Sequence, residues 1–343
     1  MKFLSLQGGT TEKRPLTEAE VKRLERFARG KKNRRGRKWP SSIPARLART
    51  AAFAPKRRGL ITDSGFVRLY VVPGHSAVKV SGRELGSQHR DAIYAVFRLP
   101  RETVTIEGVC KNPFLRFRVE HQTVTTWREL LEAMGRKAHV NNAMTLKEVF
   151  EEIKRVAVTV YADPTPGVLE GLRRGIEPVG AGALGSIIDE VIWEGVELDS
   201  RVKIVYGGHA VEAIQRAMLV SLNSDVQFRL KSDHAKSFWP YIDSMNGHSY
   251  VDEMMLASLA GRDLWAEHET SATRAQFRKD CRQAFADMVR SDGLKIWRAE
   301  VRGTGQKKWH RYHYEHALVR QLELELSNSP VAVSSPDLAA RAG

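Results

Sequence analysis

Residues 272–290 read ATRAQFRKDCRQAFADMVR and predict a helix with one apolar face. The apolar side chains follow the three- and four-residue spacing of a helix and are Phe277, Cys281, Ala284, Phe285 and Met288. Asp292-Gly293 ends this helix, and the β-prone runs 294–301 and 307–314 follow, separated by the turn-rich residues 302–306. The stretch therefore predicts a long helix followed by a hairpin.

The residues before this helix predict further elements in a defined order. Residues 230–246 have a helical apolar pattern, 248–251 are β-prone, and 252–260 open with two acids that suit a helix N-terminus. The order of helix, short strand, helix, longer helix and hairpin is that of a winged helix. In that fold the second helix of a helix-turn-helix enters the major groove and the hairpin lies beside it.

The outward face of the long helix is basic. Over 274–290 five basic residues stand against two acidic ones, a net of 5 − 2 = +3. Arginine and lysine suit phosphate and guanine, and glutamine suits adenine, so we interpret this face as a DNA-reading surface rather than a solvated amphipathic helix. The predicted DNA contacts are Arg274, Gln276, Arg278, Lys279, Arg282 and Gln283 on the helix, with Arg302, Lys307 and Lys308 on the hairpin.

A family resemblance rests on two groups of residues. The first group resembles the entry to the second winged helix of plasmid replication initiators and comprises Leu230-Lys231-Ser232, Ala235 and Phe238-Trp239. The second resembles the recognition helix of the TrfA-type initiators and comprises Phe277-Arg278, Cys281, Ala284, Asp287-Met288 and Gly293-Leu294. Pro240 departs from the pattern, because proline inside a helix removes a hydrogen bond.

The resemblance covers about residues 60–314 and implies a function. It implies a plasmid replication initiator that binds repeated double-stranded DNA sites at an origin, promotes opening and recruits the host replicative helicase and host initiator. It also implies repression of its own gene as a dimer, so a second copy of the chain is an expected partner. A winged-helix transcriptional repressor is the alternative binding protein.

The alternative enzyme is a rolling-circle nuclease with a tyrosine nucleophile. The hairpin holds suitable side chains, namely His310, Tyr312, His313, Tyr314 and His316. Such an enzyme needs ligands that converge on a metal, whereas their alternation along a strand favours packing and phosphate contact. The sequence also has no P-loop pattern. We therefore expect no catalytic residue, metal or cofactor.

The predicted fold class is α+β, with two tandem winged-helix domains behind a basic, disordered N-terminal arm. The predicted divisions are an arm at 1–59, a first unit at 60–210 with an inserted loop at 163–185, a second unit at 211–326 and a disordered tail at 327–343. Residues 1–60 hold 18 basic and 4 acidic residues, a net of +14, out of +15 for the chain. Such a concentrated charge predicts an electrostatic tether to phosphate.

The first unit has the same order of elements with a different charge. Hairpin strands are expected at 66–72 and 77–80, and helices at 88–99, 126–134 and 145–156. The runs 104–106 and 119–124 are β-prone, and the runs 156–161, 186–194 and 202–206 are expected to complete a sheet. Capping boxes at Thr126/Glu129 and Thr145/Glu148 predict the starts of the last two helices. Over 145–156 three basic and three acidic residues cancel. Lys147 and Lys154 are therefore predicted to contact DNA weakly, or the unit serves as a dimer surface.

The remaining signals concern location and a short peptide. Cys110 and Cys281 are the only cysteines, which fits a reducing cytoplasm, and no apolar run of membrane-spanning length occurs. Residues 321–326 (QLELEL) partly resemble a peptide that docks on the sliding clamp, although a helix or strand end is the favoured interpretation.

Overall fold

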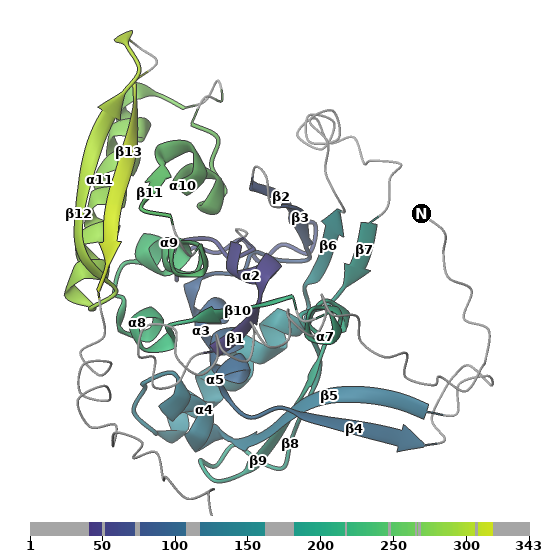
Figure 1. Ribbon diagram of the computed structural model, residues 1–343. Coiled ribbons are helices and arrows are strands. Elements are labelled where there is room, and N and C mark those ends of the chain that lie inside the picture. Colours follow the sequence, from purple (N-terminus) through teal and green to yellow (C-terminus); the bar gives the residue numbers. More distant parts are fainter. Residues whose placement is uncertain are drawn as a thin grey trace, which may run out of the picture.

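The computed structural model describes residues 41–49, 52–72, 76–107, 117–161, 182–216, 218–245, 248–264, 266, 269–305 and 308–317. These residues form a mixed structure of helices and antiparallel strands (Figure 1). The basic run 30–38, Cys110, Lys307, the clamp-like peptide 321–326 and the tail 327–343 lie outside the described residues. No helix in the described part of the chain has the length and apolar content to cross a membrane.

The strands of the first unit form two four-stranded sheets. One has the order β2-β3-β6-β7, with bounds Val67–Val72, Ser76–Ser81, Ala157–Tyr161 and Gly182–Gly185. The other has the order β4-β5-β9-β8, with bounds Glu102–Glu107, Phe117–Thr126, Arg201–Tyr206 and Ile188–Trp193. The sequence did not predict this division, because apolar alternation tells which face of a strand is buried and not which strand lies beside it. The end of the predicted loop 163–185 is itself strand β7.

Three helices pack on these sheets: α3 (Ser87–Arg98), α4 (Trp127–Ala133) and α5 (Val140–Lys154). The capping box of α4 is confirmed, because Thr126 and Glu129 each accept the other's backbone N–H at 3.2 Å. The predicted cap of α5 at Thr145 is wrong. α5 begins earlier, where the ring of His139 accepts the N–H of Asn141 at 3.2 Å, and Thr145 donates its hydroxyl to Asn141 O inside the helix.

Residues 41–49 and 52–59 belong to the folded body and not to an arm. β1 (Ser41–Pro44) pairs antiparallel with β10 (Leu219–Leu222), and α2 (Ala45–Arg49) follows it directly. Ile43, Leu47 and Phe53 are buried in the core. The arm was predicted from the net charge of residues 1–60, which gives no weight to these few apolar side chains. The arm prediction was therefore wrong beyond residue 40.

Two further helices connect the units. α7 (Gly208–Gln215) spans the expected boundary between residues 210 and 211, and α8 (Ser224–Arg229) follows β10. The second unit then contains α9 (Asp233–Ser244), β11 (Tyr250–Asp252), α10 (Glu253–Leu259), α11 (Ser271–Arg290), β12 (Leu294–Arg302) and β13 (Trp309–His316). The predicted order of elements is present, and the three strands form a sheet in the order β11-β13-β12.

The predicted apolar stripe of α11 is confirmed. Phe277, Cys281, Ala284, Phe285 and Met288 are all fully buried. The ring of Phe285 stacks on that of Tyr312, with centroids 5.0 Å apart and an interplanar angle of 7°. α11 is therefore fixed against the inner face of the β12–β13 hairpin, as Figure 1 shows.

Pro240 lies inside α9 and leaves one carbonyl without its helical partner. That carbonyl belongs to Lys236, four residues earlier, and the side-chain amide of Gln227 donates to it at 3.4 Å. Gln227 is fully buried on α8. The departure from the family pattern is thus accommodated by a side chain that replaces the missing N–H.

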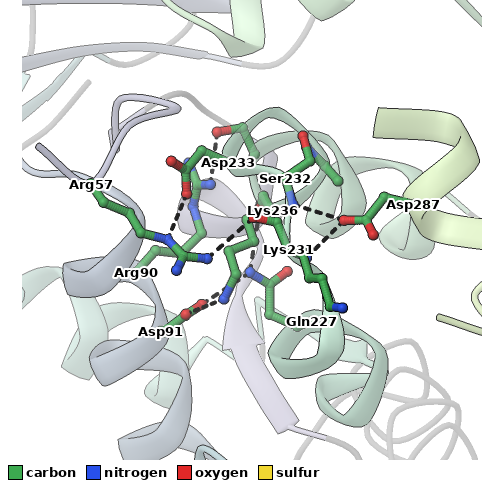
Figure 2. Close-up of polar contacts among 11 residues, drawn as sticks. Arg57, Arg90, Asp91, Gln227, Lys231, Ser232, Asp233, Lys236 and Asp287 are labelled. Carbon is green, nitrogen blue, oxygen red and sulfur yellow. Dashed lines mark hydrogen bonds and ion pairs between the residues drawn. The ribbon is translucent and has the colours of Figure 1, made fainter. Parts of the chain in front are cut away.

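A buried polar network joins the two units (Figure 2). Arg90 on α3 donates to Ser237 Oγ and to the carbonyl of Phe53, both at 2.8 Å. Its neighbour Asp91 forms an ion pair with Lys236 on α9. The contacts between α3 and α9 therefore include charged groups that are almost completely excluded from water.

Candidate nucleic-acid interface

α11 exposes its basic face to solvent along three turns. The N–H of Thr273 is accepted by the hydroxyl of the N-cap Thr270 at 3.2 Å, which fixes the start of the helix. Gln276, Lys279, Arg282 and Gln283 are exposed, as predicted. Gln276 donates to Asp280 at 2.8 Å. The same sequence period that buries the Phe277 stripe thus turns these polar side chains outward.

Three of these side chains have no polar partner within the described structure. Lys279, Arg282 and Gln283 form no hydrogen bond or ion pair with any described residue. A cation and an amide without an internal partner keep their donors available to phosphate oxygens and base edges. They are the strongest candidates for contact with nucleic acid.

Arg278, a predicted DNA contact beside the buried stripe, has its donors occupied within the protein. Its Nε donates to Glu253 Oε1 at 2.7 Å and its Nη2 donates to the carbonyl of Lys308 at 2.8 Å. The side chain is 25% exposed. Arg278 is therefore directed into the protein, between α10 and the hairpin, and not along the outward face. Arg274, one turn earlier, is half-buried and already has a partner.

The hairpin adds two basic side chains near its turn. Arg302 at the end of β12 is exposed and forms an ion pair with Glu300 at 2.9 Å. Lys308 is exposed just before β13. Because Arg302 pairs in register with Trp309, these cations lie at the same end of the hairpin. Basic side chains are therefore exposed both on α11 and at the turn end of the hairpin.

The long helix of the first unit has the opposite character. Lys147 forms an ion pair with Glu151 at 2.5 Å and lies 4.9 Å from the Trp193 ring centroid. Lys154 is exposed at the last turn. Over 140–154 two lysines stand against three glutamates, a net of 2 − 3 = −1. The described α5 is therefore a poorer surface for phosphate than α11.

Sequence reasoning missed a basic turn at the start of α5. Arg136, Lys137 and His139 lie between α4 and α5, and the side chain of Asn142 donates to Lys137 O at 2.8 Å. They were missed because the helix was predicted to start at Thr145, which left residues 136–144 as a connection between helices. The first turn of α5 contains no acid. The basic residues near the start of α5 are therefore Arg136 and Lys137 in this turn, before the helix itself.

The histidines and tyrosines of β13 are used for packing. Tyr312 and Tyr314 are buried against Phe285, and burial raises the pKa of the Tyr312 hydroxyl. A phosphodiester has no access to a hydroxyl in that position. Within the described ranges, no three His, Cys, Asp or Glu side chains are placed to hold a metal ion. Cys281 is buried and free, and burial raises the pKa of its thiol.

The structure is similar in fold to solved structures of two other proteins. A crystal structure of domains 2 and 3 of RctB has a TM-score of 0.49 at 10% identity, with 80% of this chain and 98% of that chain covered. The Pi initiator protein, crystallised in complex with iteron DNA, has a TM-score of 0.46 at 10% identity, with 82% and 98% covered. No family model and no curated protein sequence matches the chain.

Proposed function

We propose that this chain binds double-stranded DNA through two tandem winged-helix units and initiates replication at an origin with repeated sites. The observation that carries the proposal is the outward face of α11. Lys279, Arg282 and Gln283 project from a helix whose opposite face is fully buried, and no described residue occupies their donors. In a winged helix this is the recognition helix, and its exposed side chains enter the major groove.

The hairpin takes the role of the wing in this proposal. Arg302 and Lys308 lie at its turn end, where cations contact the phosphate backbone beside the groove that the helix occupies. The helix then contacts the base edges, and the phosphate contacts of the wing fix the position of the protein along the duplex. The basic turn 136–139 of the first unit is a second backbone contact, since the acidic α5 disfavours entry into a groove.

The biological role follows from the resemblance in the sequence. We infer binding to repeated origin sites, help in opening the origin and recruitment of the host helicase and host initiator. Repression of its own gene by a dimer is part of the same proposal. A transcriptional repressor with the same fold would use the same α11 surface, so DNA binding alone does not separate the two functions.

Footprinting on the DNA that flanks the gene tests the proposal. An initiator protects a series of direct repeats next to an A·T-rich segment. Protection of one palindrome in the promoter, without repeats, would support the repressor instead. Nicking of the DNA that depends on a divalent metal would overturn the non-enzymatic function. Lys279→Ala, run in parallel, should need a higher protein concentration to protect the specific sites.

A further inference from the structure

The carboxylate of Glu253 lies completely buried where three elements of the second unit meet. Glu253 is the first residue of α10, and its side chain has no exposed surface. α11 lies on one side of it and the start of β13 lies on the other. A buried charge costs free energy unless donors surround it, so the groups around Glu253 decide what it does.

Both oxygens of Glu253 are occupied by donors from two different elements. Oε1 accepts from Nε of Arg278 on α11 at 2.7 Å. Oε2 accepts from the backbone N–H of His310 on β13 at 2.7 Å, and the His310 ring Nδ1 lies 3.2 Å from the same oxygen. Arg278 adds a second connection, because its Nη2 donates to the carbonyl of Lys308 at 2.8 Å. We call Glu253, Arg278, Lys308 and His310 the Glu253 cluster.

The cluster lies at the turn end of the hairpin. His310 pairs in register with Val301, next to the pair of Arg302 and Trp309. Arg278 is adjacent in sequence to Lys279 and one turn before Arg282. The cluster therefore connects the part of α11 that carries the outward cations to the part of the hairpin that carries Arg302 and Lys308.

We propose that Glu253 and Arg278 are positioning residues that hold the wing at a fixed distance from the recognition helix, so that both contact one DNA duplex together. This inference rests on the proposed DNA binding and deepens it. Charge-assisted hydrogen bonds to a buried carboxylate have strict geometry, and the arginine fork satisfies two acceptors at once. A wing held in place before binding loses less conformational freedom when DNA arrives.

The proposal reverses the simple electrostatic expectation for Glu253. Glu253→Gln removes a negative charge from a protein that binds a polyanion, which by charge alone strengthens binding. If the cluster positions the wing, this variant instead binds the specific duplex more weakly. The slope of log K against log salt becomes shallower by roughly 0.9 for each phosphate that the wing no longer neutralises. Because the turn end has two cations, Arg302 and Lys308, the largest expected change in the slope is roughly 1.8.

The experiment compares five variants on a duplex selected from a random library by the wild-type protein. Glu253→Gln and Arg278→Lys should each show the shallower slope, because lysine keeps the charge but does not reproduce both donors of the fork. Adding Lys308→Ala to Arg278→Lys should change binding little, whereas Lys308→Ala alone weakens it. Glu300→Gln, which removes an exposed carboxylate from the same hairpin, is the matched control and should bind as well as or better than the wild type.

Hydroxyl-radical footprints separate positioning from general damage. The Glu253→Gln and Arg278→Lys complexes should lose the outer protection made by the wing and keep protection at the recognition helix. If Glu253→Gln does not fold, as circular dichroism would show, Arg278→Lys carries the test. Unchanged slope and footprint in the folded variants overturn the positioning role while leaving DNA binding intact. Failure of the wild type to select any duplex would instead refute the proposed function.

Discussion

The ammonium group of Lys236 and the carboxylate of Asp91 form an ion pair whose side chains are only 4% and 5% exposed. Asp91 comes from α3 and Lys236 from α9, so the pair joins the two units. Gln227 donates to the same carboxylate at 3.3 Å (Figure 2). A buried pair of this kind tolerates little change in the arrangement of the helices, because separating the charges leaves each of them without water.

Removal of one member of this pair should destabilise the protein strongly. Lys236→Met leaves Asp91 buried without its cation, and breaking a buried pair in this way costs about 3–5 kcal/mol. The double variant Asp91→Leu/Lys236→Met should recover much of the loss, since no charge is left buried. Unfolding in urea measures both. If the free energy of unfolding of Lys236→Met lies within about 0.5 kcal/mol of that of the wild type, water reaches the pair.

The carboxylate of Asp287 on α11 stabilises the N-terminus of α9. Its Oδ2 accepts the N–H groups of Lys231 and Ser232 at 2.7 and 2.8 Å, and the side chain is buried. Asp287→Ala leaves these donors without a partner, so we expect a loss of about 1–3 kcal/mol in the free energy of unfolding. Asp292→Asn is the control. It removes an exposed ion pair with Arg229 and should change stability by less than about 0.5 kcal/mol.

Stability should decline as the pH falls below about 6.5, the usual pKa of histidine. Burial lowers the pKa of His89 in the folded protein, although its hydrogen bond to Glu152 at 2.6 Å opposes the shift. The N–H of Gly86 donates to His89 Nδ1 at 2.9 Å, so protonation of this nitrogen would break the hydrogen bond. Burial also lowers the pKa of His121 and His234. Near and below the usual histidine pKa the unfolded chain therefore binds more protons than the folded protein, and a lower pH favours unfolding.

Unfolding in urea at several pH values between about 7.5 and 5.5 tests whether stability falls as the pH drops through the usual histidine pKa. His89→Gln should be less stable than the wild type at neutral pH and should show a weaker dependence on pH. Stability that rises on acidification would contradict the burial of neutral rings. Carboxylates with lowered pKa values, such as Glu84, act only at lower pH and do not affect this window.

Residues 1–40 should supply affinity without selectivity. They hold 13 basic and 4 acidic residues, a net of +9. Because β1 begins at Ser41, a truncation should stop at residue 40 to leave the fold intact. The truncated protein should bind selected and random duplexes more weakly at low salt, with a slope shallower by roughly 0.9 for each phosphate that these residues neutralise in the full chain. Loss of the preference for the selected duplex, with the slope kept, would place base readout in these residues.

Local periodicity predicted the parts of the site that depend on one helix. The spacing of Phe277 and Phe285 fixed which face of α11 is buried, and therefore which side chains point outward. The same reasoning did not detect the role of Arg278. Its partner Glu253 lies 25 positions earlier in the chain, and no local pattern reports an ion pair formed by tertiary folding.

Other failures have equally local causes. The start of α5 was missed because His139 caps the helix with a ring nitrogen, which lies outside the usual capping residues. The strand at 41–44 was missed because charge was averaged over 60 residues that include the buried Ile43. The division of eight strands into two sheets depends on partners far apart in the chain, such as β3 and β6.

The most direct test of the account is the binding of α11 variants to a duplex that the wild-type protein has selected from a random library. Lys279→Ala, Arg282→Ala and Gln283→Ala should each weaken specific binding by about 1–3 kcal/mol. Arg216→Ala, which removes an exposed cation at the C-terminal end of α7, should not weaken it selectively. Circular dichroism should show all four variants folded, since none of these side chains is buried. If the three α11 variants bind the selected duplex as tightly as the wild type does, α11 is not the element that reads DNA.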